Sequence, residues 1–187
     1  MPSSSPSRNV DKAVLPQYNE VDTAVAGKID ALEAEVSQQQ QHVNNVAKLP
    51  RIKCRNQRLA GKRHPKTGVL FTERVVTLGG QQYIVVAPEF DSAFDAQLPE
   101  ELRYSRDKTQ FKECNRQLWN AIQSNPQLKA MFSRKQLLFI EKGKTPRGYT
   151  WHHDVEAGKM QLVLTEIHSK TNHTGGRSLW GGGEKYR

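Results

Sequence analysis

The chain has 187 residues, a formal net charge of +9 at pH 7 and a hydrophobic fraction of 36%. That length is enough for one domain with a buried core and an appendage. No apolar run is long enough to cross a membrane, and the N-terminus lacks the apolar core of a signal peptide. Cys54 and Cys114 lie far apart in the chain, so neither a disulfide framework nor a cysteine zinc site is expected. The positive charge favours a polyanionic partner.

The first 48 residues are predicted to form a disordered leader and a helical arm. Residues 1–19 are rich in Ser and Pro, a composition typical of disorder. Residues 20–47 show helical spacing of apolar side chains, interrupted by four glutamines, before Leu49-Pro50 ends the helix. The apolar residues are Val25, Ile29, Leu32, Val36, Val43 and Val46. This stripe is typical of a short coiled coil, of a helix that docks on a domain or carrier, or of a solvated arm.

A strongly basic segment follows the arm. Residues 48–66 contain eight Lys or Arg side chains and no acidic one. Such a run is either a solvated face or a surface that contacts phosphate groups, and the sequence alone leaves both interpretations open.

The middle of the chain predicts a β-hairpin, a loop and a helix. Residues 74–78 and 82–86 alternate like strands around Gly79-Gly80, a dipeptide that suits a tight turn. The acidic stretch 87–101 has no metal-ligand rhythm and is expected to be a loop. Residues 107–123 place apolar side chains on one face of a helix, which is therefore expected to pack on the core.

The C-terminal third begins with a second predicted helix. Ser133 and Gln136 resemble a capping box that opens it, and Gly143 closes it. Residues 149–152 and 160–164 are predicted strands.

Four of the six histidines fall within 22 residues of this last part, at positions 152, 153, 168 and 173. Thr165 is expected to cap a short helix that carries His168. Adjacent residues on a strand point to opposite faces, so we expect one of His152 and His153 to bind a metal while the other faces the attacking water. His173, or Asn172 on the face of His168, completes the ligand set. Imidazole is both a common metal ligand and a base near neutral pH, which favours phosphodiester hydrolysis.

The same stretch resembles a known family. Trp151-His152-His153, residues 158–163, the two closing histidines and residues 175–178 resemble the HNH/Endonuclease VII superfamily branch with a Trp-His-His motif. That branch supplies C-terminal nuclease toxin domains of bacterial polymorphic toxins. Shorter likenesses elsewhere extend the resemblance over residues 49–187 and leave the first 48 residues unexplained.

The resemblance implies an α+β fold built on a ββα-metal (HNH/His-Me finger) nuclease core at about residues 148–176. Added helices and a β-hairpin surround this core in a domain of residues 49–187, and a leader and helical arm, residues 1–48, precede it. One divalent ion is implied, with Zn, Mg, Mn and Ni as candidates. The implied metal ligands are His152, His168 and His173, and the implied catalytic residues are His153 as general base, Gln161 and Arg177. Lys170 and Lys159 are alternatives to Arg177 for neutralising phosphates.

The function implied by the resemblance is that of a metal-dependent DNA endonuclease acting as an antibacterial toxin effector. Such a protein is soluble, leaves its producer by a route independent of a signal peptide and acts in the cytoplasm of the target bacterium. An acidic cognate immunity protein is the implied partner, and the N-terminal helix is a candidate for self-association or for binding a carrier. Three alternatives stay open: a non-catalytic zinc module that binds nucleic acid, an RNase on the same fold, and a basic adaptor without enzymatic activity.

Overall fold

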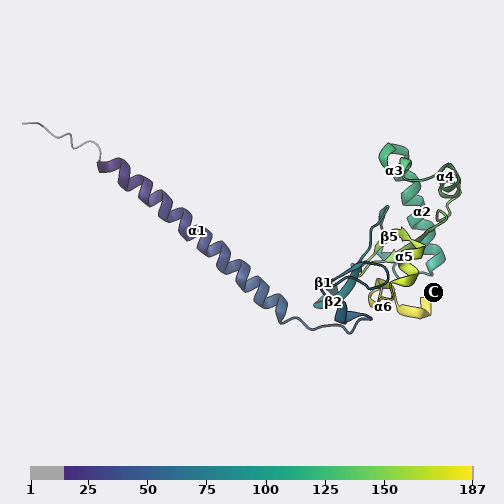
Figure 1. Ribbon diagram of the computed structural model, residues 1–187, viewed down its shortest axis with the longest axis horizontal. Helices are drawn as coiled ribbons and strands as arrows, with labels where there is room; N and C mark the ends of the chain where they lie inside the picture. The colour runs from purple at the N-terminus through teal and green to yellow at the C-terminus, as the bar shows by residue number, and fades with distance from the viewer. Residues whose placement is uncertain (1–14, 187) are drawn as a thin grey trace, which may run out of the picture. The chain divides into compact units, whose positions relative to one another are not determined.

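The computed structural model describes residues 15–186, so the predicted disorder of residues 1–14 lies outside the described residues. The chain divides into two compact units, Met1–Lys48 and Leu49–Arg187 (Figure 1). No helix in the described part of the chain is long and apolar enough to cross a membrane.

The described part of the first unit is one long helix, α1 (Leu15–Ala47). Residues 15–19 were predicted to belong to the disordered leader, and that boundary is wrong, because they form the first turns of α1. Pro16 does not prevent an earlier start, because a proline in the first turn lacks only an N–H that would have no helical partner. The helix ends ahead of Pro50, as expected from the missing N–H of that residue.

A chain that begins at Leu49 is expected to fold and to keep the predicted nuclease activity. Residues 1–48 supply no candidate ligand or base, and the second unit has its own buried core. Thermal unfolding and plasmid cleavage of the shortened chain test this expectation against the full chain. Loss of cleavage by a shortened chain that is still folded would show that the arm belongs to the active unit.

A two-stranded hairpin opens the second unit. β1 (Leu70–Leu78) pairs with β2 (Gln81–Glu89) in antiparallel register. Gly79 and Gly80 have φ of 58° and 80°, the left-handed conformation that a tight two-residue turn requires. The predicted hairpin is therefore confirmed, with longer strands than the sequence indicated.

A second, three-stranded antiparallel sheet has the order β3-β5-β4. Its strands are β3 (Asp95–Gln97), β4 (Tyr149–His153) and β5 (Lys159–Leu164). β3 lies in the stretch predicted to be a loop, and that prediction is wrong. Three residues are too few to show an alternating pattern, and β3 exists because it pairs with the edge of β5.

Three helices pack around the sheet: α2 (Asp107–Ser124), α3 (Pro126–Ala130) and α4 (Arg134–Glu141). Cys114, Leu118 and Ile122 of α2 belong to the same buried cluster as Trp151 and Leu162 of the sheet. The predicted capping box is present at the start of α4. Short 3-10 turns complete this part of the unit at Gln57–Leu59, Glu100–Leu102 and Gly183–Tyr186.

The hairpin β4-β5 runs directly into α5 (Thr165–Lys170). Thr165 is the first helical residue and Leu164 takes the cap position, so the predicted cap is wrong by one residue. A further short helix, α6 (Gly176–Leu179), follows the turn that carries His173. It is fixed because Trp180 is buried and donates a hydrogen bond from Nε1 to the Asp154 carbonyl oxygen at 2.8 Å. The observed fold is α+β with small antiparallel sheets and several helices, as predicted.

Candidate metal centre and active site

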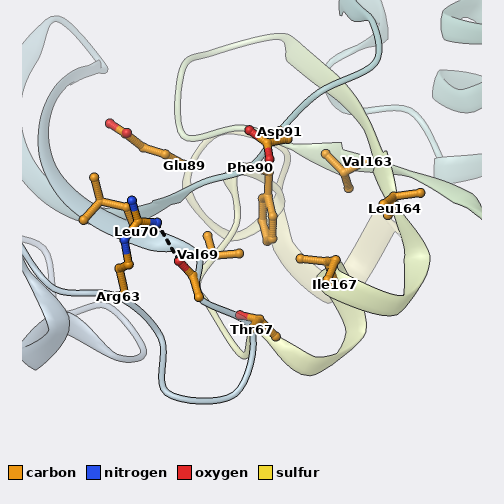
Figure 2. Close-up of a pocket in the computed structure, with 11 residues that line it drawn as sticks. Arg63, Thr67, Val69, Leu70, Glu89, Phe90, Asp91, Val163, Leu164 and Ile167 are labelled. Atoms are coloured by element: carbon orange, nitrogen blue, oxygen red, sulfur yellow. Dashed lines mark hydrogen bonds between the residues drawn. The ribbon is translucent and has the colours of Figure 1, made fainter. Parts of the chain in front are cut away.

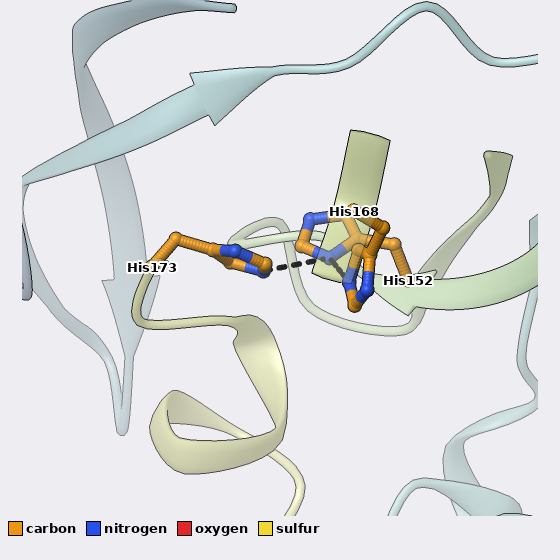
Figure 3. Close-up of side chains that lie close together, drawn as sticks. All are labelled: His152, His168 and His173. Carbon is orange, nitrogen blue, oxygen red and sulfur yellow. Dashed lines mark hydrogen bonds between the residues drawn. The ribbon is translucent and has the colours of Figure 1, made fainter. Parts of the chain in front are cut away.

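Three histidines from three successive segments bring their ring nitrogens together (Figure 3). His152 lies on β4, His168 on α5, and His173 in the turn after α5; we call these residues the histidine trio. The His152 Nδ1 atom lies 3.2 Å from His168 Nε2 and 3.2 Å from His173 Nε2. Because α5 ends at Lys170, His173 is not carried around the helix axis, and its five-residue spacing from His168 does not prevent their approach.

The geometry of the histidine trio fits a divalent cation. A ring nitrogen carries either one proton or one lone pair, so His152 Nδ1 cannot form good hydrogen bonds to both neighbouring nitrogens. A cation, by contrast, accepts a lone pair from each ring. In a tetrahedral site with metal–nitrogen bonds of about 2.0–2.1 Å, ligand nitrogens lie about 3.3–3.4 Å apart. The two distances of 3.2 Å in the histidine trio are close to that separation.

Burial also keeps the three imidazoles of the histidine trio in the neutral form that binds a cation. It lowers the pKa of His152 well below the usual value, and the neighbouring His173 and His168 lower it further. Burial lowers the pKa of His168 in the same direction. Burial, followed by the nearby His168, lowers the pKa of His173 to about 4. All three imidazoles are therefore neutral at pH 7, which is the form that a metal ion requires.

The metal-free protein is expected to lose stability as the pH falls below 6.5. In the unfolded chain each imidazole takes up a proton near pH 6.5, whereas folded His173 stays neutral until about pH 4. The unfolded state therefore binds more protons in this window, and stability decreases as the pH decreases. Each fully shifted group contributes at most about 1.4 kcal/mol per pH unit. Thermal unfolding in the presence of a chelator measures the slope.

The variant His173→Asn is the control for this prediction. It removes one of the shifted groups, so its unfolding midpoint should fall less steeply between pH 6.5 and 4 than that of the parent chain. Equal slopes in the two proteins would contradict the assignment of the acid sensitivity to the histidine trio.

Phe90 forms a wall against the histidine trio. It follows β2 directly and is 7% exposed. Its ring centroid lies 4.9 Å from that of His152, 5.4 Å from that of His168 and 5.2 Å from that of His173. A single ring in contact with all three imidazoles limits their rotation. Phe90 was not predicted to be a site residue, since it lies in an acidic stretch without periodicity.

A pocket of about 470 Å³ also has Phe90 in its wall, and Figure 2 draws the residues that line it. Arg63, from the basic run, lies in this pocket and donates a hydrogen bond to the Gly68 carbonyl oxygen at 2.8 Å. Glu89 and Asp91 bring negative charge to the same wall. None of the four clustered histidines lines it, so we assign the chemistry to a different pocket.

A smaller pocket of about 280 Å³ contains the histidine trio together with His153. Arg55 from the basic run, Asn172 and Arg177 also line it. The Arg55 backbone N–H donates to Thr174 Oγ1 at 2.8 Å, and Asn56 donates from Nδ2 to the Asn172 carbonyl oxygen at 2.6 Å. These two bonds attach the start of the second unit to the segment that carries His173.

His153 lies apart from the histidine trio, on the side of β4 that faces α2. Its Nε2 atom is 2.7 Å from Oε1 of Gln110, a side chain that is fully buried on α2. Gln110 Nε2 donates to the carbonyl oxygens of Leu102 and Arg103 at 2.9 and 2.8 Å, which fixes the orientation of the amide. Because an amide oxygen only accepts, His153 Nε2 carries the proton and the lone pair of the neutral ring is on Nδ1.

Arg177 is held next to His153 by buried polar partners. Its NH1 atom donates to Gln110 Oε1 at 3.0 Å, and its NH2 atom donates to the Ser105 carbonyl oxygen at 3.0 Å. NH2 also lies 3.0 Å from Asp107 Oδ1. The two alternative cations lie elsewhere: Lys170 pairs with Glu166, Lys159 pairs with Asp95, and neither lines the pocket of the histidines.

Gln161, the third predicted catalytic residue, lies on β5. It lies opposite His152 in the sheet, and its Nε2 atom donates to Asp95 Oδ1 at 3.4 Å. The described structure does not place it in the wall of the histidine pocket. The glutamine that contacts His153 is Gln110, which sequence analysis missed. Its signal was its position four residues before Cys114, a polar side chain on the apolar face of α2.

The end of β4 is fixed by the residue after His153. Asp154 is buried and accepts two hydrogen bonds from the Arg74 guanidinium, at 2.7 and 2.9 Å. A Cβ on Gly176 would collide with the Asp154 carbonyl oxygen and with the Trp180 ring, so only glycine allows α6 to approach here. These contacts set the position of His152 and His153 relative to Arg177.

The comparisons with known proteins include a match to a family model. A family model for the DNase/tRNase domain of colicin-like bacteriocins matches residues 81–175, just over half of the chain, including all four clustered histidines. Comparison with curated proteins and with solved structures gives no match.

Proposed function

The chain belongs to the family of DNase/tRNase domains of colicin-like bacteriocins, which are nuclease toxins, and we propose that it is a metal-dependent DNA endonuclease. The observation that carries the proposal is the convergence of the histidine trio in one pocket with His153. Phosphodiester hydrolysis requires a metal ion and a general base. The histidine trio can supply the ligands of the metal ion, and His153, which is held separately, can supply the base.

The proposal assigns β4, β5 and α5 to a ββα-metal core of the HNH type with a Trp-His-His motif. Two observations support this assignment: the hairpin runs directly into the helix, and the ligand candidates lie on β4, on α5 and just after α5.

The histidine trio would hold the divalent ion. When bound, the ion supplies positive charge that stabilises the phosphoryl oxygens as negative charge develops on them. Three neutral imidazole ligands suit Zn²⁺ or Ni²⁺, while Mg²⁺ or Mn²⁺ are alternatives in the cell.

His153 is the proposed general base. With its proton on Nε2, it accepts a proton from the attacking water at Nδ1. The imidazolium that forms lies near Asp107, whose Oδ1 atom is 3.8 Å from His153 Nε2, and the carboxylate stabilises the new charge. Gln110 is a positioning residue, because its accepting oxygen keeps His153 in the required tautomer.

Arg55 and Arg177 are the proposed phosphate contacts, since both side chains line the pocket. Arg177 is already held by Asp107 and Gln110, which fixes its guanidinium in place. Arg55 is exposed and belongs to the basic run, so we assign that run in part to phosphate contact. Gln161 remains a predicted catalytic residue. The observation that supports this prediction is its position opposite His152 in the sheet.

The variant Gln110→Met is expected to lower cleavage by about 10–100-fold, the usual effect of removing an outer partner of an active-site side chain. The change conserves volume but removes the acceptor that fixes His153 and Arg177. Initial rates on plasmid DNA at saturating metal measure the loss. Gln117→Met is the matched control, because Gln117 on the same helix donates to the Gln97 carbonyl oxygen away from the pocket. Equal rates for the two variants would contradict the positioning role.

The proposed biological role is that of an antibacterial toxin effector that is active in the cytoplasm of a target bacterium. A producer of such a nuclease needs protection, so we propose a cognate immunity protein. The net charge of +9 favours an acidic partner that binds quickly through complementary charge. Unimpaired growth of bacteria that express the chain alone in their cytoplasm would contradict this role.

Parallel incubations of the purified chain with supercoiled plasmid and with tRNA, each with a divalent ion, test the substrate. Cleavage of the plasmid is the expected result. Cleavage of tRNA alone would favour the second activity that the family description names and would overturn the choice of DNA. Binding of either nucleic acid without cleavage would favour a zinc module in place of an enzyme.

A further inference from the structure

The exposed apolar residues of α1 follow a seven-residue repeat. Ile29, Val36 and Val43 are spaced by seven, and the positions three residues after each hold Leu32, Gln39 and Val46. Val25 extends the same alternation toward the N-terminus. Spacing of three and four residues in alternation is the seam of a coiled coil, whose two sets of positions are named a and d. The a positions are therefore those of Ile29, Val36 and Val43.

This seam is open to solvent in the single chain. Every described side chain from Thr23 to Ala47 is exposed except Val46. Five of the ten large hydrophobic side chains that the described structure exposes lie on this helix, and their exposed fractions run from 49% to 65%. A helix of this kind has no packing to stabilise it, and isolated helices in water are marginal without such packing. The stripe therefore requires a partner.

We infer that α1 pairs with α1 of a second copy of the chain in a parallel two-stranded coiled coil. The side chains at the seam favour this partner over a different protein or a higher oligomer. Ile and Val at all three a positions favour two parallel strands when Leu occupies d, and Leu32 is the one Leu among the four d positions, which also hold Val25, Gln39 and Val46. Two identical α1 helices can bury each other's apolar residues, since the same residues supply both halves of the seam.

The charges that flank the seam agree with the parallel orientation. Lys28 occupies the position before Ile29, and Glu33 the position after Leu32, the two flanking positions that meet between parallel helices. In a parallel pair Lys28 of one copy faces Glu33 of the other, five residues further on, and this happens twice by symmetry.

Gln39 is the polar member of the seam. In the parallel pair the two Gln39 side chains meet and hydrogen-bond to each other, which favours this register at a cost in stability. The seam from Val25 to Val46 spans about three heptads, the lower end for a sustained coiled coil. The dimer is therefore concentration-dependent. Each dimer carries two copies of the second unit, and the inference is independent of the proposed nuclease activity.

Sedimentation equilibrium of the full chain over a concentration series tests the pairing. We expect the mass to rise from 21.2 kDa toward twice that value. Leu32→Asp places a charge in the seam and should hold the chain at the monomer mass, while the matched control Ala34→Asp on the outer face should still dimerise. A monomer at every concentration, a mass above the dimer, or a dimer that survives Leu32→Asp would overturn the inference.

Disulfide cross-linking tests the orientation. Val25→Cys lies near the N-terminal end of the seam, so two copies form a disulfide only when the helices are parallel. The native Cys54 and Cys114 are buried and compete little. Ala34→Cys on the outer face is the control that should remain uncross-linked. A dimer of the Val25→Cys variant that does not cross-link under oxidising conditions would overturn the parallel arrangement.

Discussion

Replacing His153 with alanine is expected to lower plasmid cleavage by roughly 10²–10⁴-fold, the usual contribution of a positioned acid or base. The substitution removes the proposed proton acceptor and leaves the three nitrogens of the histidine trio in place. Affinity for a divalent ion should therefore remain close to that of the parent chain. Cleavage rates at saturating metal, paired with calorimetric titration of the metal, measure the two quantities separately.

His42→Ala is the matched control for this variant, because His42 is an exposed histidine on α1, outside the second unit. It should change neither cleavage nor metal affinity. If His153→Ala loses the metal as severely as a ligand variant does, the roles of His152 and His153 are exchanged or shared. If it keeps both metal and full cleavage, His153 is not the base.

Replacing His168 with alanine is expected to weaken metal binding and to lower cleavage together. His168 Nε2 is one of the converging nitrogens, and its loss leaves two protein ligands. Loss of an outer partner already costs about 10–100-fold in metal affinity, so removal of a ligand should cost more than about 100-fold. Stability should also fall in the presence of metal, since binding free energy contributes to folding free energy.

The same calorimetric titration tests this variant. Excess metal should restore part of the cleavage by His168→Ala and none of the cleavage by His153→Ala, because only the first variant is limited by metal occupancy. Parental metal affinity in His168→Ala would contradict the assignment of the histidine trio as ligands.

Local patterns predicted the elements that depend on neighbouring residues alone. The Gly79-Gly80 turn fixed the hairpin, because a turn of this type requires positive φ at both residues. The apolar spacing of α2 predicted its buried face, and Ser133 with Gln136 predicted the start of α4. The alternation of side chains along a strand also indicated that His152 and His153 face opposite sides.

Tertiary contacts decided the features that the sequence did not reveal. β3 exists through pairing with β5, and Phe90 reaches the histidine trio only because β2 ends beside it. Gln110 meets His153 across 43 positions of the chain. In each case the partner is distant in sequence, and no local repeat marks the contact. The one signal in the sequence that marked Gln110 was its place on the apolar face of α2, four residues before Cys114.

The most direct test of a metal-dependent nuclease is cleavage of supercoiled plasmid by the purified chain with its metal removed and then returned. We expect no cleavage in the presence of a chelator and recovery when a divalent ion that suits the histidine trio is added in excess. Cleavage that persists undiminished in chelator would contradict the requirement for metal. A folded chain that cuts neither DNA nor RNA with any of Zn²⁺, Ni²⁺, Mg²⁺ and Mn²⁺ would contradict the nuclease itself.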